Sequence, residues 1–313
     1  SDWVQTCALP ILEIRQIKYF LKVAELLNFS EASKALYITQ STLSQQIKQL
    51  EAELDVVLFE RNSHEVSLTE AGDHFKRYAK KVVIDAEDCL QKMADLKDVI
   101  TGELNIGVTY SFSPLLSETV LAFMKLHPKV KLNIVYKTMG ELMDMLLHRE
   151  VDFVLAFKPT EKNDKIDSHI LFNNHLSVVM SADHPLAGYE SLSVDDLKLY
   201  ELAMPAKGLQ ARSAFDDVIQ ANSQNFKIHL ELNDVSILLK LIKQSKLVTV
   251  LAESTIHGEE GVVAVPLQVA DSDMAGCIHH LKQAYLKRSA CEFYKLLSQS
   301  RAVMKYSALA KLL

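Results

Sequence analysis

The stretch ITQSTLSQQIKQL, residues 38–50, carries two patterns at once. Leu43, Ile47 and Leu50 recur at helical spacing and predict the buried face of a helix, which Thr39 can cap at its N-terminus. The other face holds short hydroxyl and amide side chains and one cation: Gln40, Ser41, Thr42, Ser44, Gln45 and Lys48. This face is either an ordinary solvated surface or a surface that contacts another molecule.

The segments around this helix place it in a small domain. Apolar residues from Ile14 to Leu27 repeat every three or four residues and predict a first helix, and Ser30 can cap a second, short one. After the third helix, two short apolar runs at residues 56–61 and 66–68 flank a polar turn and predict a small β-wing. Two helices joined by a tight turn and followed by such a hairpin predict a winged helix-turn-helix domain over residues 12–68.

The polar face suits the edges of DNA bases. Glutamine can pair with adenine through two hydrogen bonds, serine bonds to either base type, and the threonine methyl can pack on thymine. The candidate base contacts are Gln40, Ser41, Thr42, Ser44 and Gln45, and the candidate phosphate contacts are Lys34, Lys48 and Arg61. Charge opposes this interpretation, because ten acidic residues outnumber six basic ones between Leu12 and Phe75. We therefore expect the acidic groups to face away from DNA and a monomer to bind weakly.

A long helix follows over residues 69–100, with Thr69 as its N-cap. Apolar residues alternate steps of four and three along it, as in a coiled-coil seam: Phe75, Ala79, Val82, Ala86, Cys89, Met93 and Leu96. The seam packs either on its own domain or on a second copy of the chain. We favour the dimer, which would engage two DNA half-sites at once and offset weak binding by a monomer.

From about residue 101 the pattern changes to strands alternating with helices, which predicts an α/β domain with a largely parallel sheet. The polar run at residues 159–167 is either a crossover between two subdomains or a surface loop. No GxSxG, P-loop or GxGxxG motif is present, so we expect no enzyme activity and no cofactor. Cys277 and His279 share one side of a strand, but no second ligand pair completes a metal site, so incidental residues are the preferred interpretation.

Bulk composition limits the remaining choices. The net charge of −6 excludes a polycation, and no apolar run reaches the roughly 20 residues of a membrane span. Four scattered cysteines without a CxxC pair fit a reducing cytoplasm. Residues 1–11 include VQTCALPI, which resembles a translated sequencing adaptor. We expect these residues to be a non-native leader, and the alternative is a natural frayed N-terminus.

Residues 12–72, LEIRQIKYFLKVAELLNFSEASKALYITQSTLSQQIKQLEAELDVVLFERNSHEVSLTEAG, resemble the DNA-binding domain of LysR-type transcriptional regulators. Looser motifs follow in the family's order: LNIGV at Leu104, LHPKV at Leu126, REVDFVLAF at Arg149 and DHPLAG at Asp183. The resemblance implies a winged helix-turn-helix, a linker helix and a two-lobed effector domain like a periplasmic binding protein. It also implies dimers or tetramers that bend promoter DNA in response to a small effector, and RNA polymerase as a further partner.

The resemblance places base contacts at Gln40, Ser41, Ser44 and Gln45 and on the wing at His64. This chain departs from the family's common pattern at several positions. Ser41 stands where proline is frequent, and Gln45 and His64 stand where arginine is common, so two positive charges are missing. Asp55 replaces a usual glycine after the third helix, but aspartate tolerates a left-handed turn. These departures affect the operator sequence and the affinity rather than the binding class.

The resemblance places the effector between two lobes, lobe I at about 101–160 and 267–300 and lobe II at about 161–266, followed by a tail at 301–313. Candidate effector contacts follow predicted strands: Tyr110, Ser111, Phe112, Thr138, Met139 and Pro205. The alternative for each is capping or packing only. Peroxide-sensing members carry a cysteine pair near the Pro205 loop, whereas residues 203–215 here contain none, so redox sensing is not expected.

Two other classes of function remain as rivals. The chain could be a small-molecule binding protein whose helix-turn-helix is a degraded assembly module, which the acidic count would explain. It could also be an α/β enzyme with an N-terminal DNA tether, an idea that rests on fold class alone. Loss of DNA binding without loss of effector binding on replacing Gln40 and Ser44 would favour a regulator.

Overall fold

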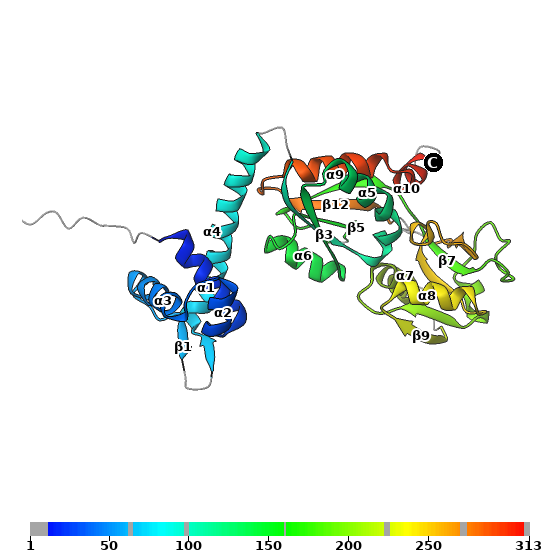
Figure 1. The fold of residues 1–313 in the computed structure, drawn as a ribbon. Helices are drawn as coiled ribbons and strands as arrows, with labels where there is room; N and C mark the ends of the chain where they lie inside the picture. The colour runs from blue at the N-terminus through cyan, green and yellow to red at the C-terminus, as the bar shows by residue number, and fades with distance from the viewer. Residues whose placement is uncertain are drawn as a thin grey trace, which may run out of the picture. The chain divides into compact units, whose positions relative to one another are not determined.

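The structure is a computed structural model that describes residues 12–61, 65–96, 100–159, 161–221, 226–269 and 274–309 (Figure 1). The chain divides into two compact units, one ending at Met93 and one beginning at Ala94. The expected leader, residues 1–11, lies outside the described residues, as does His64. Within the described part of the chain, no helix has both the length and the apolar character that a membrane span requires.

The first unit contains a three-helix core, a two-stranded wing and the start of a long helix. Its elements are α1 (Ile14–Leu26), α2 (Phe29–Ala35), α3 (Gln40–Leu54), β1 (Phe59–Arg61), β2 (Val66–Leu68) and α4 (Glu70–Asp95). The two strands pair antiparallel, with Glu60 opposite Ser67. The elements follow the order expected for a winged helix-turn-helix.

Side-chain caps set most of the helix starts. Thr39 caps α3 by accepting a hydrogen bond from the Thr42 amide at 3.2 Å, and Thr69 caps α4 by accepting one from the Gly72 amide at 2.9 Å. The second helix differs from expectation, because Asn28 rather than Ser30 caps α2. Asn28 lies one residue before the helix, where its side-chain oxygen Oδ1 accepts a hydrogen bond from the Glu31 amide, whereas Ser30 is already inside the first turn.

The core of this unit explains why α3 has a fixed orientation. Leu43, Ile47 and Leu50 are fully buried, as the periodicity predicts. Phe20 from α1 contacts Phe59 of the wing, with ring centroids 5.2 Å apart. The helix then ends at Asp55, which adopts the left-handed conformation (φ 54°), as expected for this position.

The apolar seam of the long helix α4 has a covered part and an exposed part. Ala79 is buried in the core of the first unit, and Phe75 packs on the same core with its ring 4.9 Å from that of Phe20. The prediction that these two residues belong to a dimer seam is therefore wrong, because their own domain covers the first turns of α4. Further along, Val82, Met93 and Leu96 are exposed. The exposed part of the seam begins after Ala79.

Lobe I of the second unit is a five-stranded sheet in the order β4-β3-β5-β12-β6. The strands are β3 (Gly102–Val108), β4 (Val130–Tyr136), β5 (Phe153–Phe157), β6 (Ile166–Phe172) and β12 (Gly276–Leu281). Its helical segments are η1 (Tyr110–Phe112), α5 (Ser113–Leu126), α6 (Met139–Leu147), α9 (Arg288–Gln299) and α10 (Arg301–Leu309). Helix α6 covers one face, and α5 and α9 cover the other (Figure 1).

Lobe II contains a three-stranded sheet in the order β10-β7-β11 and the separate pair β8-β9. Its strands are β7 (Leu176–Ser181), β8 (Leu202–Pro205), β9 (Ile228–Leu232), β10 (Thr249–Ala252) and β11 (Val262–Pro266). Its helical segments are η2 (Asp195–Leu199), α7 (Gln210–Ala221), α8 (Val235–Lys243) and η3 (Glu253–Ile256). The chain thus leaves lobe I after β6 and returns to it with β12.

Three expectations about this unit need correction. Neither main sheet is largely parallel. The lobe I sheet is mixed, because β12 runs antiparallel to both β5 and β6, and the three-stranded sheet of lobe II is antiparallel, because β7 runs antiparallel to both of its neighbours. Strand β6 lies in lobe I rather than in the expected lobe II range of 161–266, because it pairs with β12. Residues 301–309 form helix α10 rather than a tail: Tyr306 is buried, and the Ser307 hydroxyl donates to the Leu171 carbonyl at 2.9 Å.

Candidate nucleic-acid interface and ligand cleft

The N-terminal half of α3 presents the predicted polar face to solvent. Ser44 is half-buried, and the other members are exposed, namely Gln40, Ser41, Thr42, Gln45 and Lys48. Because the opposite face is fully buried, the helix cannot rotate without opening the core. The fold therefore holds these side chains in one fixed presentation.

Two local contacts orient the first turn of α3. The Ser30 hydroxyl from α2 donates to the Gln40 side-chain oxygen at 2.9 Å, which leaves the Gln40 amide NH₂ free to donate outward. The Thr39 hydroxyl lies 2.9 Å from that of Ser41 and 2.8 Å from that of Thr42. Ser30, predicted only as a cap, thus sets the rotamer of a candidate base contact.

Five of the six basic residues between Leu12 and Phe75 are already paired with carboxylates. Arg15, Lys18, Lys22, Lys34 and Arg61 each form an ion pair with a carboxylate. Among the described residues, Lys48 forms no such pair, so its charge remains available to a phosphate. The Arg61 guanidinium also lies 4.4 Å from the centre of the Phe29 ring, which adds a cation–π contact to its ion pair.

A small cavity lies between the two lobes at the ends of three strands. Lobe I contributes Tyr110 and Ser111 after β3 and Thr138 and Met139 after β4, whereas lobe II contributes Pro205 at the end of β8. Five of the six predicted effector contacts therefore meet at one place. The cavity also includes Lys137, Gly208, Leu209 and Gln210, which the sequence patterns do not identify as individual contacts.

Phe112 does not join this cavity, and its prediction as a cavity wall is wrong. The residue is 1% exposed, and its ring lies 5.1 Å from that of Phe157 and 5.6 Å from that of Phe172. Residues 110–112 form a single 3-10 turn, which directs Tyr110 to the cleft and Phe112 to the core. The sequence pattern shows that Tyr110 and Phe112 both follow the end of a strand, but it does not show which side chain points to the cleft and which to the core.

Thr138 and Tyr110 have structural partners of their own. The Thr138 hydroxyl donates to Glu141 Oε2 at 2.7 Å, and the Thr138 amide donates to the same atom at 3.0 Å. These bonds and Lys137 lower the pKa of Glu141 to about 2, so the cap is an anion at neutral pH. The Tyr110 ring stacks on Tyr136 at 5.8 Å. Both residues therefore combine a structural contact with a position at the cavity.

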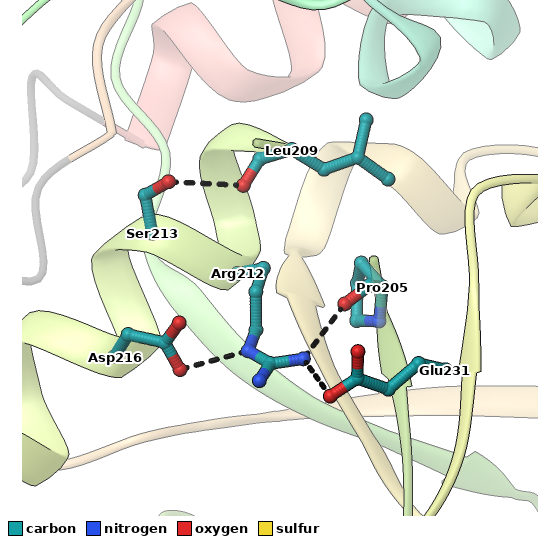
Figure 2. A network of polar contacts seen from close by, with 6 residues as sticks. All are labelled: Pro205, Leu209, Arg212, Ser213, Asp216 and Glu231. Atoms are coloured by element: carbon teal, nitrogen blue, oxygen red, sulfur yellow. Dashed lines mark hydrogen bonds and ion pairs between the residues drawn. The ribbon is translucent and has the colours of Figure 1, made fainter. Parts of the chain in front are cut away.

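A buried ion network fixes the lobe II side of the cleft (Figure 2). Arg212 on α7 is 4% exposed and donates to Asp216 at 2.7 Å, to Glu231 at 2.9 Å and to the Pro205 carbonyl at 3.1 Å. A buried guanidinium is stable only when carboxylates pair with it, as here. The network ties the end of β8 to the first turns of α7, and sequence reasoning missed it because Glu231 is remote in sequence.

Cys277 and His279 do share one face of β12, but both are engaged within the sheet. The Cys277 thiol donates to the Ala275 carbonyl at 3.4 Å, and burial raises its pKa to about 11. The His279 ring nitrogens lie 2.8 Å from the Ser168 hydroxyl and 3.3 Å from the Ala156 carbonyl. No group of three or more potential metal ligands forms among the described residues.

His279 is expected to make folding weaker as the pH falls. Burial lowers its pKa from 6.5 to about 4, so between these values the unfolded chain binds a proton that the folded chain does not. The titration of His279 therefore leaves the free energy of unfolding unchanged above pH 6.5. That free energy falls by up to about 3 kcal/mol as the pH is lowered from 6.5 towards 4, because the proton then stabilises the unfolded chain and not the folded one. Urea denaturation of the wild type and of His279→Gln between pH 7 and 4.5 measures this loss. If the free energy of unfolding depended on pH equally in the two proteins, the lowered pKa of His279 would be contradicted.

Comparisons with known proteins agree for both units. Residues 14–73 match the family model described as "Bacterial regulatory helix-turn-helix protein, lysR family", and residues 97–302 match "LysR substrate binding domain". The transcriptional dual regulator GltC of Bacillus subtilis is 28% identical over 292 residues, which is 92% of this chain and 97% of that protein.

Two solved structures share the fold. A full-length OxyR variant from Pseudomonas aeruginosa has a TM-score of 0.72 at 20% identity and covers 93% of this chain and 96% of its own. Full-length CbnR in complex with its target DNA has a TM-score of 0.64 at 19% identity and covers 91% of this chain and 99% of its own. At these identities the likeness is one of fold alone.

Proposed function

Because the chain belongs to the LysR family of bacterial transcriptional regulators, we propose that its α3 face reads promoter DNA and that its interlobe cavity receives the effector. The protein is a LysR-type DNA-binding regulator, not an enzyme, and its promoter binding and bending respond to a small molecule bound between two α/β lobes. It forms oligomers, as regulators of this family do. The particular residues, RNA polymerase as a partner, a tetrameric state and a cytoplasmic location belong to the proposal.

The observation that carries the DNA proposal is the fixed presentation of α3. Leu43, Ile47 and Leu50 anchor one face of the helix, and Ser30 presets the Gln40 side chain on the other. Gln40, Ser41, Ser44 and Gln45 would then read base edges, and Lys48 would contact a phosphate. Thr42, Lys34, Arg61 and His64 complete the proposed surface, but Lys34 and Arg61 would first have to release Glu31 and Glu51.

The oligomer proposal rests on the distal half of α4. Its exposed apolar residues, beyond those covered by the first unit, include Val82, Leu90 and Met93, and the exposed Leu96 follows directly after the helix. A second copy of the same helix would cover them and would place two α3 helices on one DNA. We retain Val82, Ala86, Cys89, Met93 and Leu96 as the dimer seam.

The effector proposal rests on groups that converge from both lobes. Ser111, Thr138 and the start of α7 supply polar groups, whereas Tyr110, Met139 and Pro205 supply apolar walls. Peroxide sensing by the cleft loop is not proposed, because residues 203–215 contain no cysteine. The rival of a small-molecule binding protein with a degraded helix-turn-helix predicts effector binding without operator binding.

DNA footprinting on the region upstream of the gene that encodes this chain tests the proposal. We expect paired half-sites, each protected on one face of the duplex and separated by about one helical turn or a multiple of it. A matched fragment with scrambled half-sites is the control for binding without sequence preference. Equal binding to the two fragments at low salt would exclude a sequence-reading regulator and would favour the rival.

A further inference from the structure

We infer that Gln210 is an internal latch: its carboxamide occupies the edge of β5 and holds the two lobes closed until an effector displaces it. The inference concerns the regulation of the proposed effector cleft and rests on that proposal. It is carried by one contact between the lobes, the pairing of Gln210 with the backbone of Phe157, which the sequence patterns do not predict.

The latch fills a gap at the edge of β5. Strand β3 pairs with β5 only as far as Val108 opposite Leu155, and the Thr109 amide closes this pairing by donating to the Leu155 carbonyl at 3.0 Å. The chain then turns into η1. Residues two apart in a strand direct their amides and carbonyls to the same edge, so Phe157 directs its own towards the place that β3 has left. These two backbone groups need partners from elsewhere.

Gln210 supplies both partners. The Phe157 amide donates to Gln210 Oε1 at 3.1 Å, and Gln210 Nε2 donates to the Phe157 carbonyl at 3.0 Å. A carboxamide carries an acceptor and a donor on one planar group, so it can replace the peptide group of a missing strand residue. Phe157 belongs to lobe I and Gln210 to lobe II, so the pair joins the lobes.

The lobe II side of the latch is rigid. Gln210 is the first residue of α7 and follows Gly208, whose φ of +90° makes the turn that glycine allows. Two residues later, the buried Arg212 binds the Pro205 carbonyl and the carboxylates of Asp216 and Glu231 (Figure 2). The loop between β8 and α7 is thus held at both ends, which fixes the direction of Gln210.

With the latch closed, the cavity beside Gln210 has almost no free space. The cavity lined by Gln210, Tyr110, Ser111 and Thr138 measures about 10 Å³, close to the minimum for one water molecule. Pockets for organic ligands are usually hundreds of Å³. An effector therefore enters only when the Gln210 side chain leaves. An effector that replaces both bonds to Phe157 carries a donor and an acceptor on neighbouring atoms, as a carboxamide does.

Amide hydrogen exchange of the full chain, without DNA or effector, tests the latch. In Gln210→Leu, which keeps the bulk and removes both polar groups, we expect exchange at Phe157 to rise roughly ten- to a hundredfold, because the two hydrogen bonds that tie the lobes are removed. Gln210→Glu keeps the acceptor but has no donor, so its exchange should be intermediate at neutral pH. Gln220→Leu changes an exposed glutamine of the same helix and should leave Phe157 protected.

The outcomes separate the latch from the proposed function. Wild-type protection of Phe157 in a folded Gln210→Leu or Gln210→Glu protein would overturn the latch, whatever the chain does with DNA. If Gln210→Leu fails to fold, the same decision rests on Gln210→Glu. If footprinting shows no specific binding but the Gln210 variants exchange faster at Phe157 as expected, the result would count against the proposed DNA function alone.

Discussion

Replacing Gln40 and Ser44 together with alanine is expected to abolish sequence-specific operator binding at concentrations where the wild type is saturated. A good bidentate base contact contributes about 1–3 kcal/mol of discrimination, and the change removes one glutamine and one serine contact from each subunit of the proposed dimer. We therefore expect the affinity for the operator to fall roughly a hundredfold or more, while binding to unrelated DNA changes little. Fluorescence anisotropy with operator and scrambled duplexes measures both affinities.

Salt dependence separates base reading from phosphate binding in this experiment. Gln40 and Ser44 are neutral, so their removal should lower the affinity without changing the slope of log K against log salt. Lys48→Ala should instead reduce that slope by about one for each phosphate that is no longer neutralised. Gln49→Ala is the matched control, because Gln49 is exposed on the same helix but donates to Glu53 at 3.2 Å. Equal operator affinity for the wild type and the double variant would exclude base reading by this face.

The segments that sequence predicts well are those that local forces determine. In α3, the Thr39 cap, the buried positions Leu43, Ile47 and Leu50 and the left-handed end at Asp55 all depend on neighbours within a few residues. The same holds for β9 (Ile228–Leu232), in which apolar and polar residues alternate from one position to the next. Patterns of period 3.6 or 2 carry this information directly.

The errors arise where the partner is distant in sequence. Strand β6 carries Asp167, Ser168 and His169 in its middle and lies at the edge of its sheet, so it lacks the apolar signal of a central strand. Phe75 and Ala79 continue the heptad pattern of α4, but periodicity does not reveal which partner covers each position.

The cleft shows the same limit. Five of the six predicted residues meet there, because strand ends followed by helices are recognisable in sequence. Gln210 lies in the expected loop, yet its pairing with Phe157 depends on where β3 ends, which only the assembled sheet defines. The Arg212 network likewise joins residues from α7, β8 and β9.

Replacing Val82 with lysine is expected to separate the proposed dimer into monomers, because it would place a charge from each chain in the proposed seam of α4. Taking an unpaired ammonium out of water costs several kcal/mol, which is enough to prevent association at micromolar concentration. Val82 is 45% exposed in the single chain, so the substitution should leave the first unit folded. Sedimentation velocity measures the association state, and thermal unfolding measures the fold.

The neighbouring Val83 provides a control, because its side chain is buried in the first unit whereas that of Val82 is exposed. It is 9% exposed and packs in the core of the first unit, so Val83→Lys should unfold that unit rather than only separate the subunits. Val82→Ile should sediment as the wild type, because it keeps the seam apolar. Dimerisation through α4 would bring a second α3 helix to the same DNA. The Val82→Lys monomer should therefore also bind the operator more weakly, because it lacks the avidity that offsets the acidic charge of the DNA-binding domain. Unchanged sedimentation of Val82→Lys would show that other surfaces hold the subunits together and that the apolar stripe beyond Ala79 has another partner.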